Sequence, residues 1–330
     1  MPLQQLGNQL FAITTPQAFD ACALQVFAYQ STHNWVYAQY LQYLGVDVTA
    51  VTTINQIPFL PVELFKSHTV LINNCTPSIT FSSSSTTGTG QSLHHVPDVT
   101  IYEQSFTKAF QLFYGNVSNY AVLALLPSYQ EREGSSLIYM VDALITQSNN
   151  ATSGYFLNQN QQLYTTLLQL SASNTPTLLI GVSYALLDFI ERYNLPQSTN
   201  LIVMETGGMK GKRKELVKEE LHQQLQQGFG VATIHSEYSM TELLSQAYSN
   251  ANGLYSCPPW MRVLIRDVND YKQVLPYNTT GGVNVIDLAN LYSCAFVATQ
   301  DLGKLHAYNS FEILGRFDHS DIRGCNLLYQ

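Results

Sequence analysis

A regular alternation of short apolar runs and helix-like segments in the middle of the chain constrains the fold more than any other feature. Ala121–Leu126 is an uninterrupted apolar run ended by Pro127, which is typical of a strand buried in a parallel sheet. Further strands are predicted at Thr177–Gly181, Leu201–Met204 and Val231–Ile234, each followed by a helix, at Ser183–Tyr193, Arg213–Gln227 and Met240–Ala247. This alternation predicts an α/β protein with a parallel sheet covered by helices.

The segments on either side of the alternation differ from each other. Before it, helices are predicted at about 16–30, 35–44, 106–113, 134–145 and 163–170. After residue 255 the helical pattern stops, and short strands are predicted at Met261–Ile265, Val283–Ile286, Ala295–Ala298 and Phe311–Leu314. We therefore expect an α/β core over residues 1–255 and a smaller β-rich end over 256–330, packed together as one continuous domain.

The composition argues against several classes of protein. A formal net charge of −8 disfavours nucleic acid or an anionic membrane as the partner. No apolar run approaches the ~20 residues of a membrane helix, and the first residues lack the pattern of a signal peptide. The five cysteines form no CxxC pair, which favours a reducing cytoplasm over a disulfide framework or a zinc site. They are Cys22, Cys75, Cys257, Cys294 and Cys325.

The stretch from Phe81 to Ser92 offers a row of hydroxyl groups and two glycines, without a charge. Glycine lets the backbone approach a ligand closely, and consecutive N–H groups in such a loop form an anion site. We interpret it as a loop that covers the phosphates of a nucleotide, although a flexible linker has the same composition. It is not a Walker P-loop, because no Gly-Lys-Ser/Thr follows. The candidate phosphate-binding residues are Ser84, Ser85, Thr86, Thr87, Gly88, Thr89 and Gly90.

A second candidate segment, Glu205–Glu215, leaves a predicted strand, turns at Gly207-Gly208 and enters a predicted helix. This geometry places backbone N–H groups at the carboxyl edge of a parallel sheet, where ligands bind in α/β proteins. Basic residues crowd the predicted helix start, where the helix dipole disfavours cations, so an anion there would stabilise them. The alternative is a solvated basic face. The basic residues are Lys210, Lys212, Arg213 and Lys214.

The third candidate segment, His235–Glu242, also follows a predicted strand. Thr241 can donate to a phosphate, Glu242 can hold Mg²⁺, and Tyr238 can stack on a base. The alternative is a plain helix start, with Ser239 as the N-cap and Glu242 completing a capping box.

Two further candidate segments lie near the end of the chain, around Asp301 and around Arg316 and Asp318. Asp301 follows a predicted strand, where its carboxylate can accept both hydroxyls of a ribose, although turn aspartates are common. Arg316 can contact ribose or phosphate, and Asp318 can act at a hinge, although both also suit a charged turn.

Taken in order, these segments resemble the core motifs of the adenylate-forming enzymes, over about residues 55–325. The most similar branch is the acyl-protein synthetase of the bacterial bioluminescence fatty-acid reductase complex, and phenylacetate-type CoA ligases are more distant. The stretches that match this branch are Ile57–Pro61 with Phe65-Lys66, Leu126–Tyr129 with Arg132 and Gly134–Ile138, Glu205–Gly208, and Arg323–Cys325.

The resemblance implies the large N-terminal-type domain of that superfamily, with ATP and Mg²⁺ as cofactors. It implies that Ser84–Gly90 cover the phosphates, that Gly207 and Gly208 line the adenine, and that Tyr238 stacks on it. It further implies Thr241 and Glu242 at phosphate and Mg²⁺, and Asp301 and Arg316 at the ribose.

The sequence departs from the superfamily in one respect. Typical members continue into a small lid domain that supplies a catalytic lysine, whereas this chain ends five residues after Cys325. We therefore expect no separate lid domain, and Lys210 or Lys212 is the candidate that replaces the lysine.

The resemblance implies that a carboxylic acid, expected to be a fatty acid, is activated to acyl-AMP and transferred to a thiol. In the acyl-protein synthetase this thiol belongs to the enzyme near its C-terminus. Cys325 fits, because it neighbours Arg323 and a nearby cation lowers the pKa of a thiol. The alternative for Cys325 is a small buried hydrophobic residue. The implied partner is an acyl-acceptor protein, a reductase or a carrier.

Three other functions stay open at this point. A truncated acyl-CoA ligase would use CoA as the acceptor, and a non-catalytic nucleotide-binding subunit would act as a scaffold. A hydrolase would combine a cysteine or serine with His94, His95 or His235, but no nucleophile elbow G-x-S-x-G is present.

Overall fold

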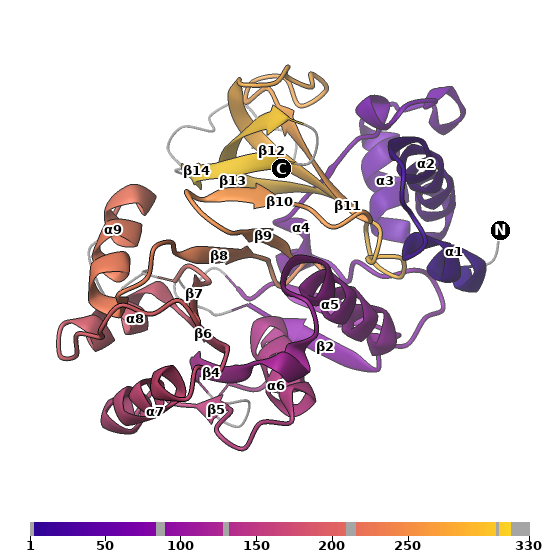
Figure 1. Ribbon diagram of the computed structural model, residues 1–330. Coiled ribbons are helices and arrows are strands. Elements are labelled where there is room, and N and C mark those ends of the chain that lie inside the picture. The colour runs from indigo at the N-terminus through magenta and orange to yellow at the C-terminus, as the bar shows by residue number, and fades with distance from the viewer. Residues whose placement is uncertain (1–2, 84–89, 128–131, 209–215, 308–309, 318–330) are drawn as a thin grey trace.

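The computed structural model describes residues 3–83, 90–127, 132–208, 216–307 and 310–317, and the account below concerns these residues (Figure 1). Within them, twelve strands form one mixed sheet in the order β11-β12-β13-β14-β10-β9-β8-β7-β6-β4-β5, with β1 paired to β13. The strands of this sheet are β1 Leu60–Pro61, β4 Ala121–Leu125, β5 Gly154–Tyr155, β6 Thr177–Gly181, β7 Leu201–Glu205, β8 His235–Tyr238, β9 Ala247–Ser249, β10 Leu254–Ser256, β11 Met261–Arg266, β12 Thr280–Asp287, β13 Phe296–Ala307 and β14 Ser310–Arg316.

The sheet has a parallel half and an antiparallel half that meet at β8. From β5 through β4, β6 and β7 to β8 all pairs are parallel. From β8 through β9, β10, β14, β13 and β12 to β11 all pairs are antiparallel. The α/β fold expected from the sequence is therefore confirmed, and the β-rich end continues the same sheet edge to edge. The boundary at residue 255 stays a prediction.

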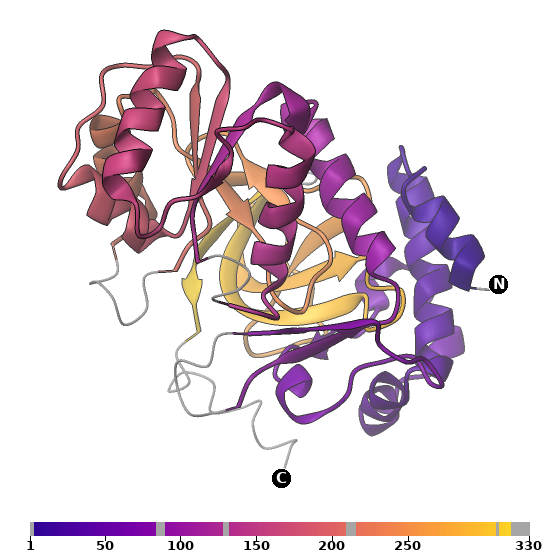
Figure 2. The same ribbon diagram turned by 90° about the horizontal axis from the view of Figure 1, so that it is seen from below.

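Helices cover both faces of the parallel half (Figures 1 and 2). Alternate residues of β4 face opposite sides: Leu123 packs with α7, α8 and α9, whereas Val122 and Ala124 belong to the cluster that contains α5 and α6. All five residues of β4 are buried, which explains their continuous apolar sequence. The helices are α1 Leu3–Leu10, α2 Pro16–His33, α3 Trp35–Tyr43, α4 Leu64–Ser67, α5 Val99–Tyr114, α6 Ser136–Ser148, α7 Asn160–Ala172, α8 Ser183–Ile190 and α9 Lys218–Phe229.

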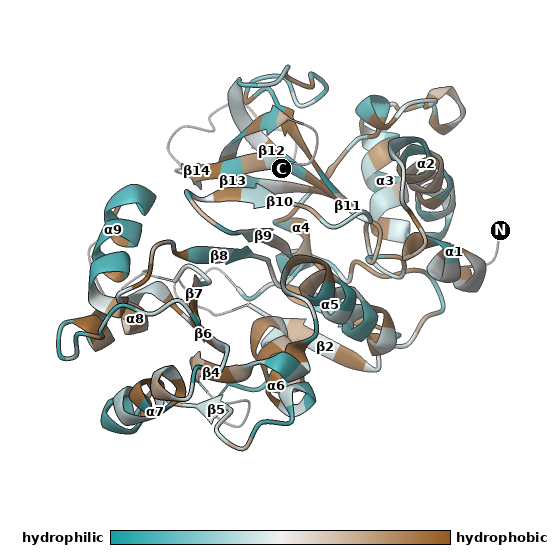
Figure 3. Ribbon diagram, in the orientation of Figure 1, coloured by the Kyte–Doolittle hydropathy of each residue, from teal (hydrophilic) through white to brown (hydrophobic). Residues whose placement is uncertain are grey.

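Local sequence accounts for several element boundaries. α2 begins where expected, with the Thr15 side chain accepting from the backbone N–H of Ala18 and with proline in its first turn. α9 is amphipathic and buries only one side, so it is predominantly teal in Figure 3 whereas β4 is predominantly brown. None of the described helices is long and apolar enough to cross a membrane.

Two predicted elements are wrong. Val231–Ile234 is not a strand, because α9 ends at the left-handed Gly230 and the chain then crosses as a loop whose apolar side chains Val231 and Ile234 fill the core. β8 begins only at His235.

Residues 240–246 do not form a helix either, so the capping box proposed for Ser239 and Glu242 is wrong. The Asp287 carboxylate accepts from the backbone N–H of Leu244 at 2.7 Å and from the Ser245 hydroxyl at 2.5 Å. The Leu244 N–H, which would bond a carbonyl within a helix, therefore bonds a side chain that is distant in sequence. The chain then continues directly into β9.

The sequence analysis also missed a hairpin of two short strands, β2 Ile79–Ser82 and β3 Leu93–Val96, which flanks the Ser/Thr/Gly loop. α9 begins at Lys218 rather than Arg213; residues 209–215 lie outside the described part.

Candidate nucleotide and acid site

Strands β6, β7 and β8 end at one edge of the parallel half, and candidate residues follow two of them. After β7, Gly207 and Gly208 have φ angles of +74° and +89°, a region that favours glycine. The carbonyl oxygen of Gly207 accepts from the backbone N–H of Ser183 at 2.8 Å, and its own N–H donates to Glu205 Oε2 at 2.7 Å. The glycine turn is therefore held in one conformation beside the start of α8.

The carboxylate of Glu205 organises this turn from inside the protein. Glu205 is 2% exposed, and its Oε1 lies 3.2 Å from Lys218 Nζ and 3.5 Å from His222 Nε2. Burial would raise the pKa of Glu205, but the hydrogen bond with His222 and the charge of Lys218 outweigh it and hold the pKa well below its ordinary value. The buried Glu205 carboxylate is therefore paired with the ammonium group of Lys218. The sequence analysis included Lys218 only as a helix residue.

Tyr238, Asp301 and Arg316 come together although they are far apart in the chain. Tyr238 ends β8, and its phenol donates to Asp301 Oδ2 at 2.8 Å. Arg316 Nε donates to Asp301 Oδ1 at 3.1 Å, and the two residues are register partners in β13 and β14. The predicted ribose residues and the predicted adenine residue therefore share one hydrogen-bonded cluster. Tyr238 is only 9% exposed, so its hydroxyl serves the cluster rather than solvent.

An aromatic group connects this cluster with the glycine turn. The ring of Tyr255 meets those of Tyr238 at 5.8 Å and Phe311 at 5.4 Å between centroids. Lys218 Nζ donates to the Tyr255 hydroxyl and lies 4.5 Å from the centre of its ring. Lys218 therefore contacts both Glu205, on the parallel half, and Tyr255, on the antiparallel half.

Thr241 and Glu242 form a turn directly after β8. His94 Nδ1 lies 2.9 Å from the carbonyl oxygen of Thr241, and because a carbonyl only accepts, Nδ1 carries the proton. Asn290 Nδ2 donates to the carbonyl oxygen of Glu242 at 2.8 Å. Two buried side chains thus fix the backbone of this turn.

The side chain of Glu242 is buried, and burial raises its pKa, although a hydrogen bond with Ser92 and the charges of Arg316 and Lys66 oppose the rise. The described part of the chain holds no group of three or more His, Cys, Asp or Glu residues suited to a metal. Mg²⁺ with nucleotides is usually held by one or two carboxylates together with phosphate oxygens and water, and the single Glu242 carboxylate fits that arrangement.

The base of the Ser/Thr/Gly loop lies beside Glu242. Ser83 and Ser92 close the loop through Ser83 N–H to Ser92 O at 3.1 Å and Ser92 N–H to Ser83 Oγ at 3.0 Å. Gly90 has a φ of +79°, as the loop reading requires. Because Ser92 bonds Glu242, the ends of the loop are anchored beside the predicted metal carboxylate.

Several predicted residues lie outside the described part of the chain. They are Ser84, Ser85, Thr86, Thr87, Gly88, Thr89, Lys210, Lys212, Arg213, Lys214, Asp318 and Cys325. Their roles stay predictions.

The histidines of the hydrolase alternative are engaged in the fold. Burial lowers the pKa of His94 to about 4, and its ring packs on Phe65. His235 Nδ1 pairs with the Tyr114 hydroxyl at 3.2 Å, and burial lowers the pKa of both His95 and His235.

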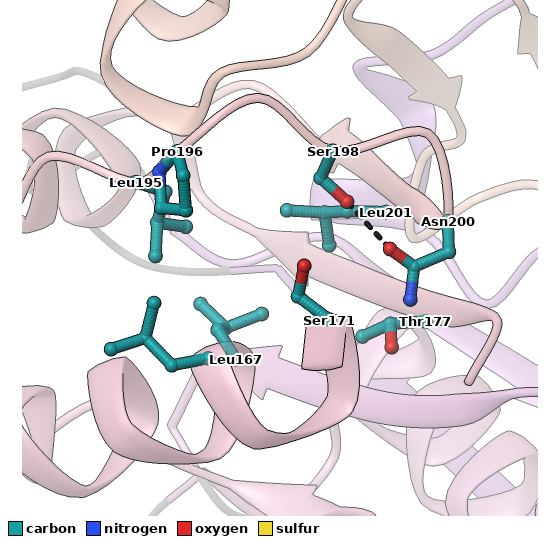
Figure 4. A pocket seen from close by; sticks show the side chains of 9 residues that line it. Leu167, Ser171, Thr177, Leu195, Pro196, Ser198, Asn200 and Leu201 are labelled. Atoms are coloured by element: carbon teal, nitrogen blue, oxygen red, sulfur yellow. Dashed lines mark hydrogen bonds between the residues drawn. The ribbon is translucent and has the colours of Figure 1, made fainter. Parts of the chain in front are cut away.

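A separate small pocket lies at the opposite edge of the sheet (Figure 4). Thr177 and Leu201, which begin β6 and β7, line it. Its polar groups are already engaged: Asn200 accepts from Ser198 Oγ at 2.6 Å and donates to the Thr175 carbonyl oxygen at 2.6 Å. This pocket is therefore not part of the candidate site.

Comparison with known proteins identifies a family and a fold. The family model described as acyl-protein synthetase, LuxE, matches residues 14–330. A 2-hydroxyisobutyryl-CoA ligase in an open conformation with 2-HIB-AMP and CoA superposes with a TM-score of 0.66 at 11% identity, over 93% of this chain and 77% of that one. ATP-bound MatB from Rhodopseudomonas palustris superposes with a TM-score of 0.54 at 17% identity, over 72% of this chain and 47% of that one. No curated protein matches the chain. At these identities the two ligase structures establish a shared fold.

Proposed function

The chain belongs to the LuxE family of acyl-protein synthetases, and from that premise we propose that it uses ATP to activate a carboxylic acid as acyl-AMP and then passes the acyl group to a thiol. The observation that supports this proposal is the convergence of the glycine turn, the Tyr238–Asp301–Arg316 cluster, Glu242 and the base of the Ser/Thr/Gly loop. The structural neighbours support ATP in particular, because one was solved with ATP and the other with an acyl-AMP.

The nucleotide would lie along the carboxyl edge of the parallel strands. Gly207 and Gly208 present backbone without side chains to the adenine. Asp301 uses one lone pair of each oxygen for Tyr238 and Arg316, and the remaining lone pairs can accept the two ribose hydroxyls. Arg316 is half exposed and can turn toward a phosphate.

Adenylation would proceed by in-line displacement. A carboxylate oxygen of the acid forms a bond with the α-phosphorus, the bond from that phosphorus to the oxygen bridging to the β-phosphate breaks, and pyrophosphate leaves. Mg²⁺, when bound, supplies neutralisation of phosphate charge. Thr241 and the loop N–H groups would hold the phosphates in line, so the protein contributes by positioning and electrostatics.

A thiol would then attack the acyl carbon, and AMP would leave as a thioester forms. The four cysteines in the described residues are poor candidates, because burial raises the pKa of each, to about 11 for Cys22 and about 12 for Cys294. This supports Cys325 as the acyl-carrying residue. The acceptor of the acyl group would be a reductase or carrier protein, and the free thiols support a cytoplasmic location.

ATP–pyrophosphate exchange with a panel of carboxylic acids tests the proposal. Exchange that depends on an acid is the expected result, and its absence with every acid would favour a nucleotide-binding scaffold. Addition of CoA distinguishes an acyl-protein synthetase from a truncated CoA ligase, because the ligase would release acyl-CoA.

A further inference from the structure

A second buried polar group lies on the side of β8 that faces away from Asp301. Glu237 and Tyr248 are register partners in β8 and β9, so their side chains leave the same face of the sheet. Gln246 lies directly before β9, two residues from Tyr248, and is buried as well. Tyr238, the neighbour of Glu237, points to the other face, toward Asp301. We call Glu237, Gln246 and Tyr248 the β8–β9 polar cluster.

The cluster is covered by aromatic side chains of α5. The ring of Tyr248 meets those of Phe113 and Tyr114, each at 5.3 Å between centroids. The charge of Glu237 also contributes to the raised pKa values of Tyr102, Tyr114 and Tyr248, which places these phenols near its carboxyl group.

The cluster has polar atoms that lack hydrogen-bond partners within the described part of the chain. They are Glu237 Oε1, Gln246 Oε1 and Nε2, and the Tyr248 hydroxyl, and the three residues are 4%, 1% and 2% exposed. An unpaired buried polar group destabilises a fold, and native proteins almost always pair such groups. Four such atoms in three neighbouring residues of β8, β9 and the residue before β9 indicate a missing partner rather than an isolated irregularity.

A neighbouring buried polar group shows that this fold pairs polar side chains where no ligand is needed. Ser105 Oγ lies 3.1 Å from Ser245 Oγ and accepts from Trp260 Nε1 at 3.0 Å. Ser245 in turn donates to Asp287. Gln246 follows Ser245 directly. The Ser245 hydroxyl is hydrogen-bonded, whereas the Gln246 amide has no hydrogen-bond partner among the described residues. The β8–β9 polar cluster thus gathers four polar atoms that are unpaired in the described part of the chain, in three neighbouring residues, beside a group that is hydrogen-bonded.

The cluster also lies within reach of the reaction that the proposed function describes. Thr241 lies four positions after Glu237, which is at most ~13 Å of extended chain. An acid whose carboxylate meets the α-phosphate near Thr241 and Glu242 must extend its other end away from the nucleotide. The face of β8 opposite Tyr238 is turned toward α5, so a tail that reaches the cluster would enter between α5 and the sheet.

We infer that the β8–β9 polar cluster binds a hydroxyl or amino group carried on the tail of the acid substrate, so that the enzyme selects a polar acid over its plain alkyl counterpart. This inference rests on the proposed function. The Gln246 amide can donate and accept, the Tyr248 phenol can do either, and the Glu237 carboxylate accepts, so the complement is a ligand group with a donor hydrogen. Burial raises the pKa of Glu237 to about 7, against a hydrogen bond with Ser239, so a cationic ligand group would favour its charged form.

The test is ATP–pyrophosphate exchange with acids matched in length, as a plain alkanoic acid and its chain-hydroxylated and chain-aminated counterparts. For the better polar acid we expect kcat/KM to exceed that of the plain acid at least ~100-fold, since a buried hydrogen-bonding site strongly rejects an analogue that leaves it unpaired. Tyr248→Phe, which removes one hydroxyl and keeps the ring, should reduce this ratio about 10-fold or more, and Gln246→Leu likewise.

Tyr37→Phe is the matched control. Tyr37 is also a fully buried tyrosine, but its hydroxyl donates to the Pro58 carbonyl oxygen at 2.6 Å, and neither residue belongs to the cluster. It should leave the ratio of polar to plain acid unchanged while lowering thermal stability. Reading a ratio within each variant separates selectivity from a general loss of folded enzyme.

The outcomes distinguish the inference from the function it rests on. Exchange that favours the plain acid, or a selectivity ratio unchanged in both Tyr248→Phe and Gln246→Leu, would overturn the inference and leave adenylation standing. Absence of exchange with every acid would overturn both.

Discussion

The Tyr238 phenol donates a hydrogen bond to Asp301 Oδ2 across 2.8 Å, joining residues that are 63 positions apart. Tyr238 ends the last strand of the parallel half, and Asp301 lies in the antiparallel half. Together with Arg316 on the other carboxylate oxygen, this bond fixes Asp301 before any ligand is present. A carboxylate held in this way can meet ribose hydroxyls without reorganisation, which favours binding.

Asp301→Asn should weaken ATP binding because it removes the charge that is proposed to accept the ribose hydroxyls. We expect kcat/KM for ATP in the exchange assay to fall about 10- to 100-fold, in line with a lost hydrogen bond to a charged group. The KM for the acid should change little. Asp47→Asn, at an exposed helix cap, is the control and should behave as wild type. An unchanged KM for ATP in Asp301→Asn would remove this residue from the ribose.

Glu242→Gln should abolish most of the exchange, at least ~100-fold, because a neutral amide cannot replace the carboxylate that is proposed to hold Mg²⁺. Raising the Mg²⁺ concentration should recover part of the rate. Glu219→Gln, on the exposed side of α9, is the control. Full exchange by Glu242→Gln would take this residue off the metal.

Lys218→Met should destabilise the protein by about 2 kcal/mol at pH 7, because it removes the cation beside the buried Glu205 carboxylate and leaves the His222 ring as the other nearby partner. This is less than the usual effect of breaking a buried pair, since Lys218 is 31% exposed and solvent screens its charge. Chemical denaturation measures the loss, with the exposed Lys272→Met as control.

The pH dependence provides a second measurement on the same pair. The pKa of Glu205 is lowered in the folded protein, so its contribution to the free energy of unfolding is present above the unfolded-state pKa of about 4.3 and is lost as the pH falls below it. In Lys218→Met the pKa of Glu205 should rise toward the unfolded-state value, so the stability lost on acidification should be smaller and should be complete at a higher pH. Identical stability curves for the two proteins would mean that Lys218 does not stabilise the Glu205 carboxylate.

Cys325→Ser should abolish hydroxylamine-sensitive labelling of the protein by ATP and a labelled acid, while ATP–pyrophosphate exchange continues. Adenylation precedes thiol attack, so only the second step should be lost. Cys75→Ser is the matched control, because among the described cysteines Cys75 is the one that is not buried. Labelling that survives in Cys325→Ser would assign the acceptor role to another group.

The alternation of strands and helices was predictable because its signal is local. Thr177–Gly181 has the bounds found for β6, and continuous apolar residues mark β4 as buried on both faces. Local patterns failed where distant partners decide the structure. The apolar Val231 and Ile234 suggest a strand, but they fill the core from a loop. Over residues 240–247 a helix was expected, but the Asp287 carboxylate bonds the backbone of Leu244 and holds this segment in a non-helical conformation.

The candidate site was predictable in its residues and less so in its connections. Tyr238, Asp301 and Arg316 were each chosen for separate reasons, and the structure brings them into one cluster. Lys218 carried no signal, because its importance depends on the distant Glu205 and Tyr255. Glu237 was overlooked beside Tyr238, since unpaired polar atoms become visible only when every neighbour of a side chain is known.

Neighbouring positions of β8 point to opposite faces, with Tyr238 toward Asp301 and Glu237 toward α5. One short strand can therefore serve two recognition tasks that vary independently. With the proposed roles, substitutions at 237, 246 and 248 would change acid selectivity without altering the residues proposed to bind ATP. A change of acid substrate would then require few substitutions, all at neighbouring positions in or beside β8 and β9.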